Sequence, residues 1–264
     1  MNFKDQVIWI TGASSGIGEA LAIAFSKLDA ELILSSRNLD KLEIVKAKCL
    51  NPEKIKVLKL DLQDYQNLDK VVGKALKLFN KIDILINNGG ISQRSLAIDT
   101  GIAIDVKIFE TNYFGTIALT KAILPYFAAR NNGHIVVVTS VVGKIGTPLR
   151  SSYAASKHAL HGFFDSLRAE VHKHHINITL ICPGYVNTNV SKNALVADGS
   201  KQNTLDKATE NGLSPTVFAE KMIKAIANKK QEVVIGGAKE KMAVFVKRYF
   251  PKLLAKMIRK INVT

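Results

Sequence analysis

The sequence predicts an α/β domain built on a doubly wound parallel sheet of about seven strands. Short apolar runs alternate along the chain with segments of helical spacing, a pattern typical of a sheet with helices on both faces. Most runs are apolar throughout, as strands covered on both faces tend to be. The expected strands span 6–11, 31–36, 54–60, 82–87, 133–140, 176–182 and 232–236.

The segments between these runs carry apolar residues at helical spacing. The expected helices span 16–28, 39–49, 64–79, 101–130, 150–174 and 215–229. No internal repeat, low-complexity run or linker divides the 264 residues, a length that suits one sizeable domain. We therefore expect one domain over 1–237, followed by a basic amphipathic extension over 238–264.

Composition is ordinary for a globular protein, with 47% apolar and 22% charged residues. The two cysteines, Cys49 and Cys182, match no metal-ligand spacing and indicate a reduced compartment without disulfides. The first residues, which include Asp5, have no signal-peptide pattern, and no apolar run reaches the length of a membrane span. The expected location is the cytoplasm, with attachment to a membrane surface as an open alternative.

The net charge of +15 suits an anionic partner, which could be nucleic acid, a membrane surface or a small ligand. No zinc-finger spacing or RNA-binding aromatic signature accompanies the charge, so nucleic acid is not expected as a partner. His172, His174 and His175 gather at the expected end of a helix without a carboxylate or cysteine at ligand spacing. A cationic cap explains them, and no metal is predicted.

A glycine-rich turn, TGASSGIG at 11–18, follows the first expected strand and opens the first expected helix. Gly12, Gly16 and Gly18 permit a tight turn and a close approach to a pyrophosphate, which the positive end of the helix then faces. Their spacing differs from the general G-x-G-x-x-G fingerprint. A tight connection alone could also use three glycines, but the strand before and the helix after favour a dinucleotide site.

The end of the second expected strand indicates which dinucleotide binds. An acidic residue there would hydrogen-bond the ribose hydroxyls of NAD. The sequence instead reads LSSRN, with Ser36 and Arg37. No carboxylate repels a 2′-phosphate, and the guanidinium of Arg37 can grip one. The prediction is NADP(H), whereas an Arg37 that is only solvated would make the preference modest.

Tyr153 and Lys157 stand one helical turn apart, so their side chains leave the same face. A packed Tyr ring beside an extended Lys is an ordinary surface arrangement, and the pair alone decides nothing. A phenol has a pKa of about 10, which an adjacent ammonium lowers toward values useful for proton transfer. Ser140 ends an apolar strand, at the carboxyl edge where open α/β sheets bind ligands.

Taken together, these motifs resemble the short-chain dehydrogenase/reductase superfamily, which has a Rossmann-type fold. The matching elements run in the family's order from residue 7 to about 236. They are TGASSGIG (11–18), DL (61–62), NNGG (87–90), Asn112 in ETNYFGT, Ser140, YAASK (153–157) and PG (183–184). More narrowly, NNGGISQRS and YAASKHALHGFFDSLRAE resemble the dehydrogenase/reductase member 7 group, which is related to hydroxysteroid dehydrogenases. Gly89 stands where the usual motif, NNAG, has alanine.

The resemblance implies an NADP(H)-dependent oxidoreductase that interconverts a carbonyl and a secondary alcohol. It makes Tyr153 the proton donor, Lys157 a ligand of the nicotinamide ribose and Ser140 a partner of the substrate oxygen. It gives Asn112 a water that reconnects the pair to solvent. The implied cofactor-binding residues are Gly12, Ser14, Ser15, Gly16, Ile17, Gly18, Arg37, Asp61, Leu62, Asn88, Gly89, Gly90, Tyr153, Lys157, Pro183, Gly184, Val186 and Thr188.

A polar segment, 187–214, follows a strand end and is long for a simple connection. A substrate lid is expected there, with a disordered insertion as the alternative. Its VSKNALV stretch favours a lipophilic substrate, although steroid-like, retinoid-like, fatty and small polar carbonyls all stay open. The resemblance also implies a homo-oligomer, dimer or tetramer, formed through helices 101–130 and 150–174.

The C-terminal segment is predicted to be a basic amphipathic helix that Pro251 bends or restarts. It could lie on an anionic membrane through 241–261, or pack on the protein's own body or a second subunit. Its expected apolar stripe comprises Met242, Phe245, Val246, Tyr249, Phe250, Leu253, Leu254, Met257, Ile258 and Ile261. A non-catalytic NADP-binding protein acting through this tail is the rival function, which the intact Tyr153, Lys157 and Ser140 disfavour.

Overall fold

Seven parallel strands form the single sheet of the computed structural model, which describes residues 3–259. Their order across the sheet is β3-β2-β1-β4-β5-β6-β7. They span β1 Val7–Thr11, β2 Glu31–Ser36, β3 Ile55–Lys59, β4 Ile84–Asn87, β5 Gly133–Val138, β6 Ile176–Pro183 and β7 Glu232–Ile235. The predicted doubly wound sheet is confirmed, and each strand lies at its expected place in the sequence.

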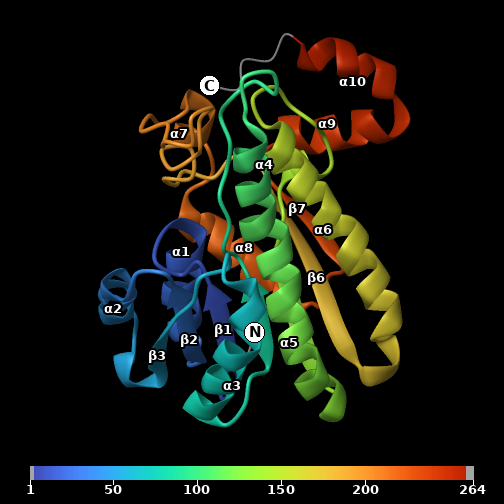
Figure 1. Ribbon diagram of the computed structural model, residues 1–264. Coiled ribbons are helices and arrows are strands. Elements are labelled where there is room, and N and C mark those ends of the chain that lie inside the picture. The colour runs from blue at the N-terminus through green and yellow to red at the C-terminus, as the bar shows by residue number, and fades with distance from the viewer. Residues whose placement is uncertain (1–2, 260–264) are drawn as a thin grey trace.

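Side chains that alternate along the strands supply two separate cores. Ile8 and Ile10 of β1 point to one face, whereas Val7 and Trp9 point to the other. The first face is covered by α1 (Gly16–Ser26), α2 (Leu39–Ala47) and α8 (Pro215–Ala227). The second is covered by α3 (Leu68–Phe79), α5 (Gly115–Ala129) and α6 (Ser151–Glu170) (Figure 1). The strands are therefore buried on both sides, which explains their continuous apolar runs.

The chain reverses its winding at β1, because β2 and β3 lie on one side of it and β4 to β7 on the other. At such a switch point the connections leave the carboxyl ends of neighbouring strands in opposite directions and open a crevice between them. The segments after β1, β4 and β5 carry the predicted glycine loop, NNGG motif and Ser140. The topology thus brings the predicted motifs together.

The helix expected over 101–130 is interrupted, which corrects the prediction of one continuous helix. It comprises α4 (Ile102–Phe109), a π-helical turn (Glu110–Phe114) and α5. Such π-turns widen a helix locally and occur often at functional sites. This one contains Asn112, whose side chain is fully buried. Hydrophobic periodicity could not show the turn, because one extra residue hardly changes the apolar pattern.

The helix expected over 150–174 is also shorter than predicted, because α6 ends at Glu170. His172–His174 form a separate 3₁₀ turn, and His175 has a φ of 53° that redirects the chain into β6. The three histidines therefore lie beyond the end of α6.

The 187–214 segment has defined structure and is not a disordered insertion. Isolated bridges join Val186 to Leu213 and Gln93 to Leu195, and a short helix, α7 (Lys207–Glu210), follows. Ser191 and Asp206 are buried within it. Figure 1 shows α7 at the same end of the molecule as the carboxyl ends of the strands, where a lid would have to lie.

The C-terminal segment forms two helices, α9 (Ala238–Tyr249) and α10 (Pro251–Ile258), so the predicted restart at Pro251 is confirmed. The single apolar stripe is wrong: Val246 and Leu254 are buried against Val141 and Ile145 of the body. A second apolar face stays exposed and comprises Met242, Phe245, Tyr249, Phe250, Leu253 and Met257. Lys260 and Ile261, which the expected tail includes, lie outside the described residues. Within 3–259, no helix is both long and apolar enough to cross a bilayer.

Candidate active site

One cavity of about 620 Å³ runs along the crevice at the switch point. It gathers nearly every site residue that the sequence predicted. These lining residues are Gly12, Ser14, Ser15, Gly16, Ile17, Arg37, Asp61, Leu62, Asn88, Gly89, Gly90, Ser140, Tyr153, Lys157, Pro183, Gly184, Val186 and Thr188. Gly18 and Asn112 are not among its lining residues, but both contact residues that line it.

The glycine loop fits a phosphate-bearing ligand. Gly12 and Gly16 have φ values of 63° and 59°, a region that glycine adopts without steric cost. A Cβ on Gly12 would lie 2.8 Å from the Cα of Gly89, so the ends of β1 and β4 can approach only without it. Ser15 precedes α1 in an extended conformation and its side chain does not cap the helix. The first N–H groups of α1 are thus left for an anion.

Asn88 and Thr11 hold the two sides of this crevice together. The Asn88 side-chain amide donates to the carbonyl oxygens of Thr11 and Gly12, at 3.0 and 3.2 Å. The Thr11 hydroxyl oxygen accepts from the backbone N–H groups of Asn88 and Gly89. Asn88 therefore fixes the glycine loop as well as lining the cavity, a role that the sequence did not reveal.

Positive charge lines the cavity near the end of β2. Arg37 follows β2, and Lys41, in the first turn of α2, lines the same cavity. Asn38 caps α2 by accepting from the N–H of Lys41 at 2.9 Å, which stabilises the first turn of the helix. Lys41 was not predicted, although its place four residues after Arg37 on a helix start was a usable signal.

Tyr153 and Lys157 lie in the first two turns of α6 and face Ser140 across the cavity. The Lys157 ammonium donates to the Val138 carbonyl at 2.9 Å and lies 5.9 Å from the centre of the Tyr153 ring. The Ser140 hydroxyl oxygen accepts from the N–H of Val142 at 3.2 Å, which places it at the end of β5. The predicted pair and Ser140 are therefore brought together.

Burial and neighbouring charge act in opposite directions on the pKa of Tyr153, whereas burial alone shifts that of Lys157. Burial raises the pKa of the Tyr153 phenol, while a hydrogen bond with Ser140 and the positive charges of Arg150 and Arg94 oppose the rise. Burial lowers the pKa of Lys157 to about 8. Sequence spacing points only to Lys157 as a positive charge near the phenol, and neither arginine was predicted. Arg94 lies in the segment after β4, far from Tyr153 in sequence, whereas Arg150 directly precedes α6.

Asn112 supports the site from the π-turn. Its side-chain oxygen accepts from the N–H of Ile91 at 2.8 Å, and its amide donates to the Ile91 carbonyl and the Ser156 hydroxyl. A Cβ on Gly90 would lie 3.0 Å from the Asn112 oxygen and 3.5 Å from the Lys157 nitrogen. Asn112 thus anchors the segment after β4 and lies close to Lys157.

The comparisons with known proteins agree with this geometry. The family model described as short chain dehydrogenase matches residues 6–198. The chain belongs to the short-chain dehydrogenase family. The bovine dehydrogenase/reductase SDR family member 7B is 41% identical over 262 residues, covering 97% of this chain and 81% of that protein. A Drosophila melanogaster SDR family protein 7-like is 41% identical over 253 residues, covering 94% of this chain and 78% of that one. The predicted resemblance to the member 7 group is confirmed.

Solved structures of short-chain dehydrogenases share the fold. A Burkholderia phymatum short chain dehydrogenase/reductase in complex with NAD matches with a TM-score of 0.84 at 22% identity, over 96% of each chain. A Thermococcus sibiricus alcohol dehydrogenase complexed with 5-hydroxy-NADP matches with a TM-score of 0.74 at 24% identity, over 88% of this chain and 97% of that one. This short-chain dehydrogenase is an oxidoreductase of the SDR family.

The buried ammonium gives a first prediction for this dehydrogenase. A lysine whose pKa is lower in the folded than in the unfolded protein reduces the free energy of unfolding wherever the unfolded chain holds it charged. For Lys157 this loss is complete below its folded pKa of about 8, and it disappears as the pH approaches the unfolded value of 10.5. Lys157→Met should therefore raise the free energy of unfolding by about 1–3 kcal/mol at pH 7, without added ligand. Urea unfolding between pH 6.5 and 10.5 measures the difference, which should shrink as the pH rises.

Lys224→Met, on the exposed face of α8, is the matched control and should show no such pH-dependent difference. An unfolding free energy that Lys157→Met lowers equally at every pH would contradict the prediction.

Proposed function

We propose that this short-chain dehydrogenase uses NADP(H) to interconvert a carbonyl and a secondary alcohol. The observation that carries the proposal is the gathering of Tyr153, Lys157 and Ser140 in the same cavity as the glycine loop. Either group alone has an ordinary explanation. Their meeting at one sheet edge does not, because phosphate binding and proton transfer are the two requirements of nicotinamide chemistry at a carbonyl.

The bound nicotinamide would supply or accept the hydride at the reacting carbon. In the reductive direction the Tyr153 hydroxyl gives its proton to the carbonyl oxygen as that oxygen becomes negative. The Ser140 hydroxyl holds the same oxygen. Lys157, beside the phenol, favours the phenolate that is left, and Asn112 serves the water that returns a proton to it. In the oxidative direction the phenolate takes the alcohol proton.

The preference for NADP(H) rests on the charges at the end of β2. Arg37 and Lys41 line the cavity there, and both are exposed and able to reach a 2′-phosphate. Ser35 and Ser36 end the strand where an NAD site would place a carboxylate. Related folds include one protein in complex with NAD and one complexed with 5-hydroxy-NADP, so the local charges have to decide.

The substrate is proposed to be lipophilic. Val190 and Leu195 of the lid line the cavity, together with Ile91 after β4. Apolar walls of this kind favour a substrate that can leave water. The alternative is the non-catalytic NADP-binding protein, which would need no ordered Tyr153, Lys157 and Ser140.

Self-association is proposed through α4, α5 and α6. Ile102, Val106 and Phe114 are 76, 49 and 43% exposed, and they lie on α4 and the π-turn. Exposed apolar side chains grouped on neighbouring turns favour a protein interface, and a homodimer or homotetramer would cover them.

The exposed face of α9 and α10 is proposed to contact an anionic membrane from the cytoplasm. The buried face of these helices already packs on the body, so packing on the protein accounts for only part of their apolar residues. Six large apolar side chains remain exposed, and six exposed basic residues flank them within 241–259: Lys241, Lys247, Arg248, Lys252, Lys256 and Arg259. Basic charge beside apolar surface is complementary to anionic lipid.

Tyr153→Phe tests the chemistry. It removes only the hydroxyl, so NADPH-dependent reduction across a panel of lipophilic and polar carbonyls should fall about 10²- to 10⁴-fold in kcat. NADPH binding, followed by protein fluorescence, should stay within about twofold of the original. Tyr126→Phe, at the amino-end edge of the sheet, is the control and should keep full activity. A panel without turnover despite tight NADPH binding would favour the non-catalytic alternative.

Arg37→Ala tests the cofactor preference. Losing a charge-assisted contact to the 2′-phosphate should raise the dissociation constant for NADPH about 10- to 100-fold while that for NADH changes less than about twofold. Lys46→Ala, farther along α2 and outside the cavity lining, should change neither. Equal losses for the two cofactors would contradict a 2′-phosphate contact.

Vesicle co-sedimentation tests the membrane contact. The protein should bind vesicles with about 30% phosphatidylserine far better than neutral ones, and less at high salt. Phe245→Ser/Leu253→Ser should weaken this binding at least about tenfold, because two apolar side chains no longer leave water. Ile44→Ser/Leu50→Ser is the control, because these side chains are about as exposed but lie on and after α2, away from the tail; it should leave vesicle binding unchanged. Binding that survives the first pair, or self-association through this face without lipid binding, would overturn the proposal.

A further inference from the structure

A short segment after β4, residues 92–95, lies between the lid and the helix that carries Tyr153. On one side the Gln93 side-chain oxygen accepts from the N–H groups of Ser152 and Tyr153, at 2.9 and 3.3 Å. It therefore caps the first turn of α6. On the other side the main chain pairs with the lid: the Arg94 N–H donates to the Leu195 carbonyl at 2.8 Å, and the Leu195 N–H donates to the Ser92 carbonyl.

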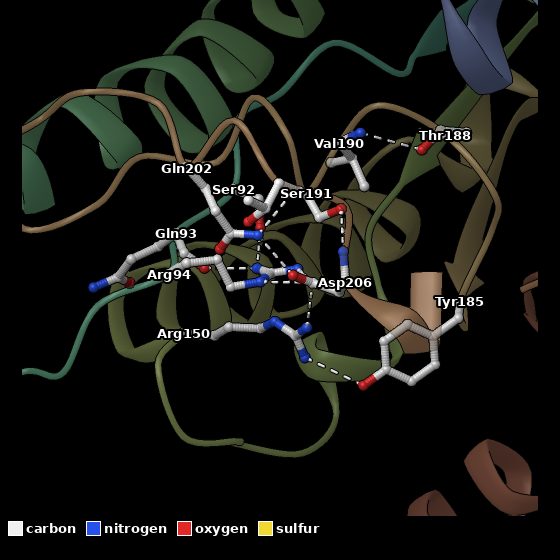
Figure 2. A network of polar contacts seen from close by, with 11 residues as sticks. Ser92, Gln93, Arg94, Arg150, Tyr185, Thr188, Val190, Ser191, Gln202 and Asp206 are labelled. Carbon is white, nitrogen blue, oxygen red and sulfur yellow. Dashed lines mark hydrogen bonds and ion pairs between the residues drawn. The ribbon is translucent and has the colours of Figure 1, made fainter. Parts of the chain in front are cut away.

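A buried charge cluster fastens the far end of the lid to the same segment (Figure 2). Asp206 lies 112 residues from Arg94 in sequence, and one of its oxygens accepts from two nitrogens of Arg94, at 2.9 and 2.6 Å. Arg150 approaches this oxygen at 3.5 Å. Gln202, also in the lid, donates to the other oxygen at 2.7 Å. The Arg94 and Asp206 side chains are only 5 and 1% exposed.

The third nitrogen of Arg94 is also bonded. It donates to the Ser92 hydroxyl and to the Gln93 carbonyl. Arg150 donates to the Tyr185 hydroxyl at 3.4 Å and stacks over that ring, so it ties the start of α6 to the segment before the lid. Ion pairs so thoroughly buried need every partner in place, since removing one leaves an uncompensated charge.

The cluster lies beside the first turn of α6, which carries the reacting phenol. Three cations lie around the first two turns of α6: Lys157 on the helix, Arg150 directly before it and Arg94 after β4. Two carboxylates accompany them. Asp206 of the lid pairs with the arginines, and Asp105 of α4 accepts from the Ser152 hydroxyl. Cations outnumber carboxylates in this set. The carboxylate that offsets the arginines is carried by the lid.

We propose that Arg94, Arg150 and Asp206 are positioning residues of the reaction, in which the lid carboxylate of Asp206 binds the two guanidinium groups beside the first turn of α6, the turn that carries Tyr153. This proposal rests on the proposed function, in which Tyr153 transfers the proton. The cluster sets both the fit of the lid over the substrate and the electrostatic surroundings of the phenol.

Opposite charge changes in the cluster separate this role from simple stabilisation. Asp206→Asn removes the negative charge, so the two arginines act on the phenol without their carboxylate and its pKa should fall. Arg94→Gln removes a positive charge, so the phenol pKa should rise. We expect shifts of roughly half a unit to one unit in these opposite directions. A purely structural cluster would impair both variants without moving the pKa in opposite senses.

The measurement is an ultraviolet titration of phenolate absorbance on the whole protein, with the curve of the matching Tyr153→Phe variant subtracted. It needs no substrate, so it tests the cluster even when no carbonyl in the panel is turned over. With an active substrate, the alkaline limb of the kcat/KM profile for reduction should move down in pH for Asp206→Asn and up for Arg94→Gln. KM for the carbonyl should rise about tenfold in both, because the lid is no longer fastened.

Two further variants serve as controls. Circular dichroism shows whether each variant still folds. Arg94→Lys keeps the charge but loses the forked contact, so the titration should stay in place while KM rises. Asp165→Asn, an exposed carboxylate on α6 paired with Arg168, should change neither quantity. Titrations that coincide for Asp206→Asn, Arg94→Gln and the original protein, or that move in the same direction, would overturn the proposal.

Discussion

The candidate active site depends on three cations that are held out of water around the first two turns of α6. Lys157, Arg94 and Arg150 are each less than a tenth exposed, and a buried cation is tolerated only when its hydrogen bonds are made by the protein. Two of these cations therefore fix the place of a backbone segment: Lys157 binds the carbonyl of Val138, and Arg94 binds residues 92 and 93. The end of β5, the segment after β4 and the 187–214 segment are held in place by the hydrogen bonds and ion pairs that they make to these buried charges.

The sheet supplies the stability that this arrangement requires. Two apolar cores, one on each face, fix the seven strands, so their carboxyl ends form a rigid edge. Loops attached to that edge can hold strained or desolvated groups that an isolated loop could not order. The low polarity that makes a charge unfavourable there also strengthens its action on Tyr153, because electrostatic interactions are screened less than in water.

Local pattern accounts for what the sequence predicted well. The strands, the glycine loop and the Tyr153–Lys157 pair are written in periodicity or spacing over fewer than ten residues, and the structure keeps them. The Arg94–Asp206 pair joins positions 112 residues apart, and no local pattern marks either partner. The π-turn at Asn112 is invisible for a different reason: it is selected by the bonds that Asn112 makes to Ile91, which are tertiary contacts.

The C-terminal helices show the same limit of local pattern. Apolar spacing along a helix shows that one side is apolar, but it could not divide the tail into a docked face and an exposed face. The docked face, with Val246 and Leu254, packs on Val141 and Ile145, which closely follow Ser140. The start of α9 also crowds Gly184, because a Cβ there would meet Glu240 at 3.1 Å. The tail thus braces two segments of the cavity wall. A surface that binds the exposed face of the tail is therefore linked, through these contacts, to the end of β5 where Ser140 lies.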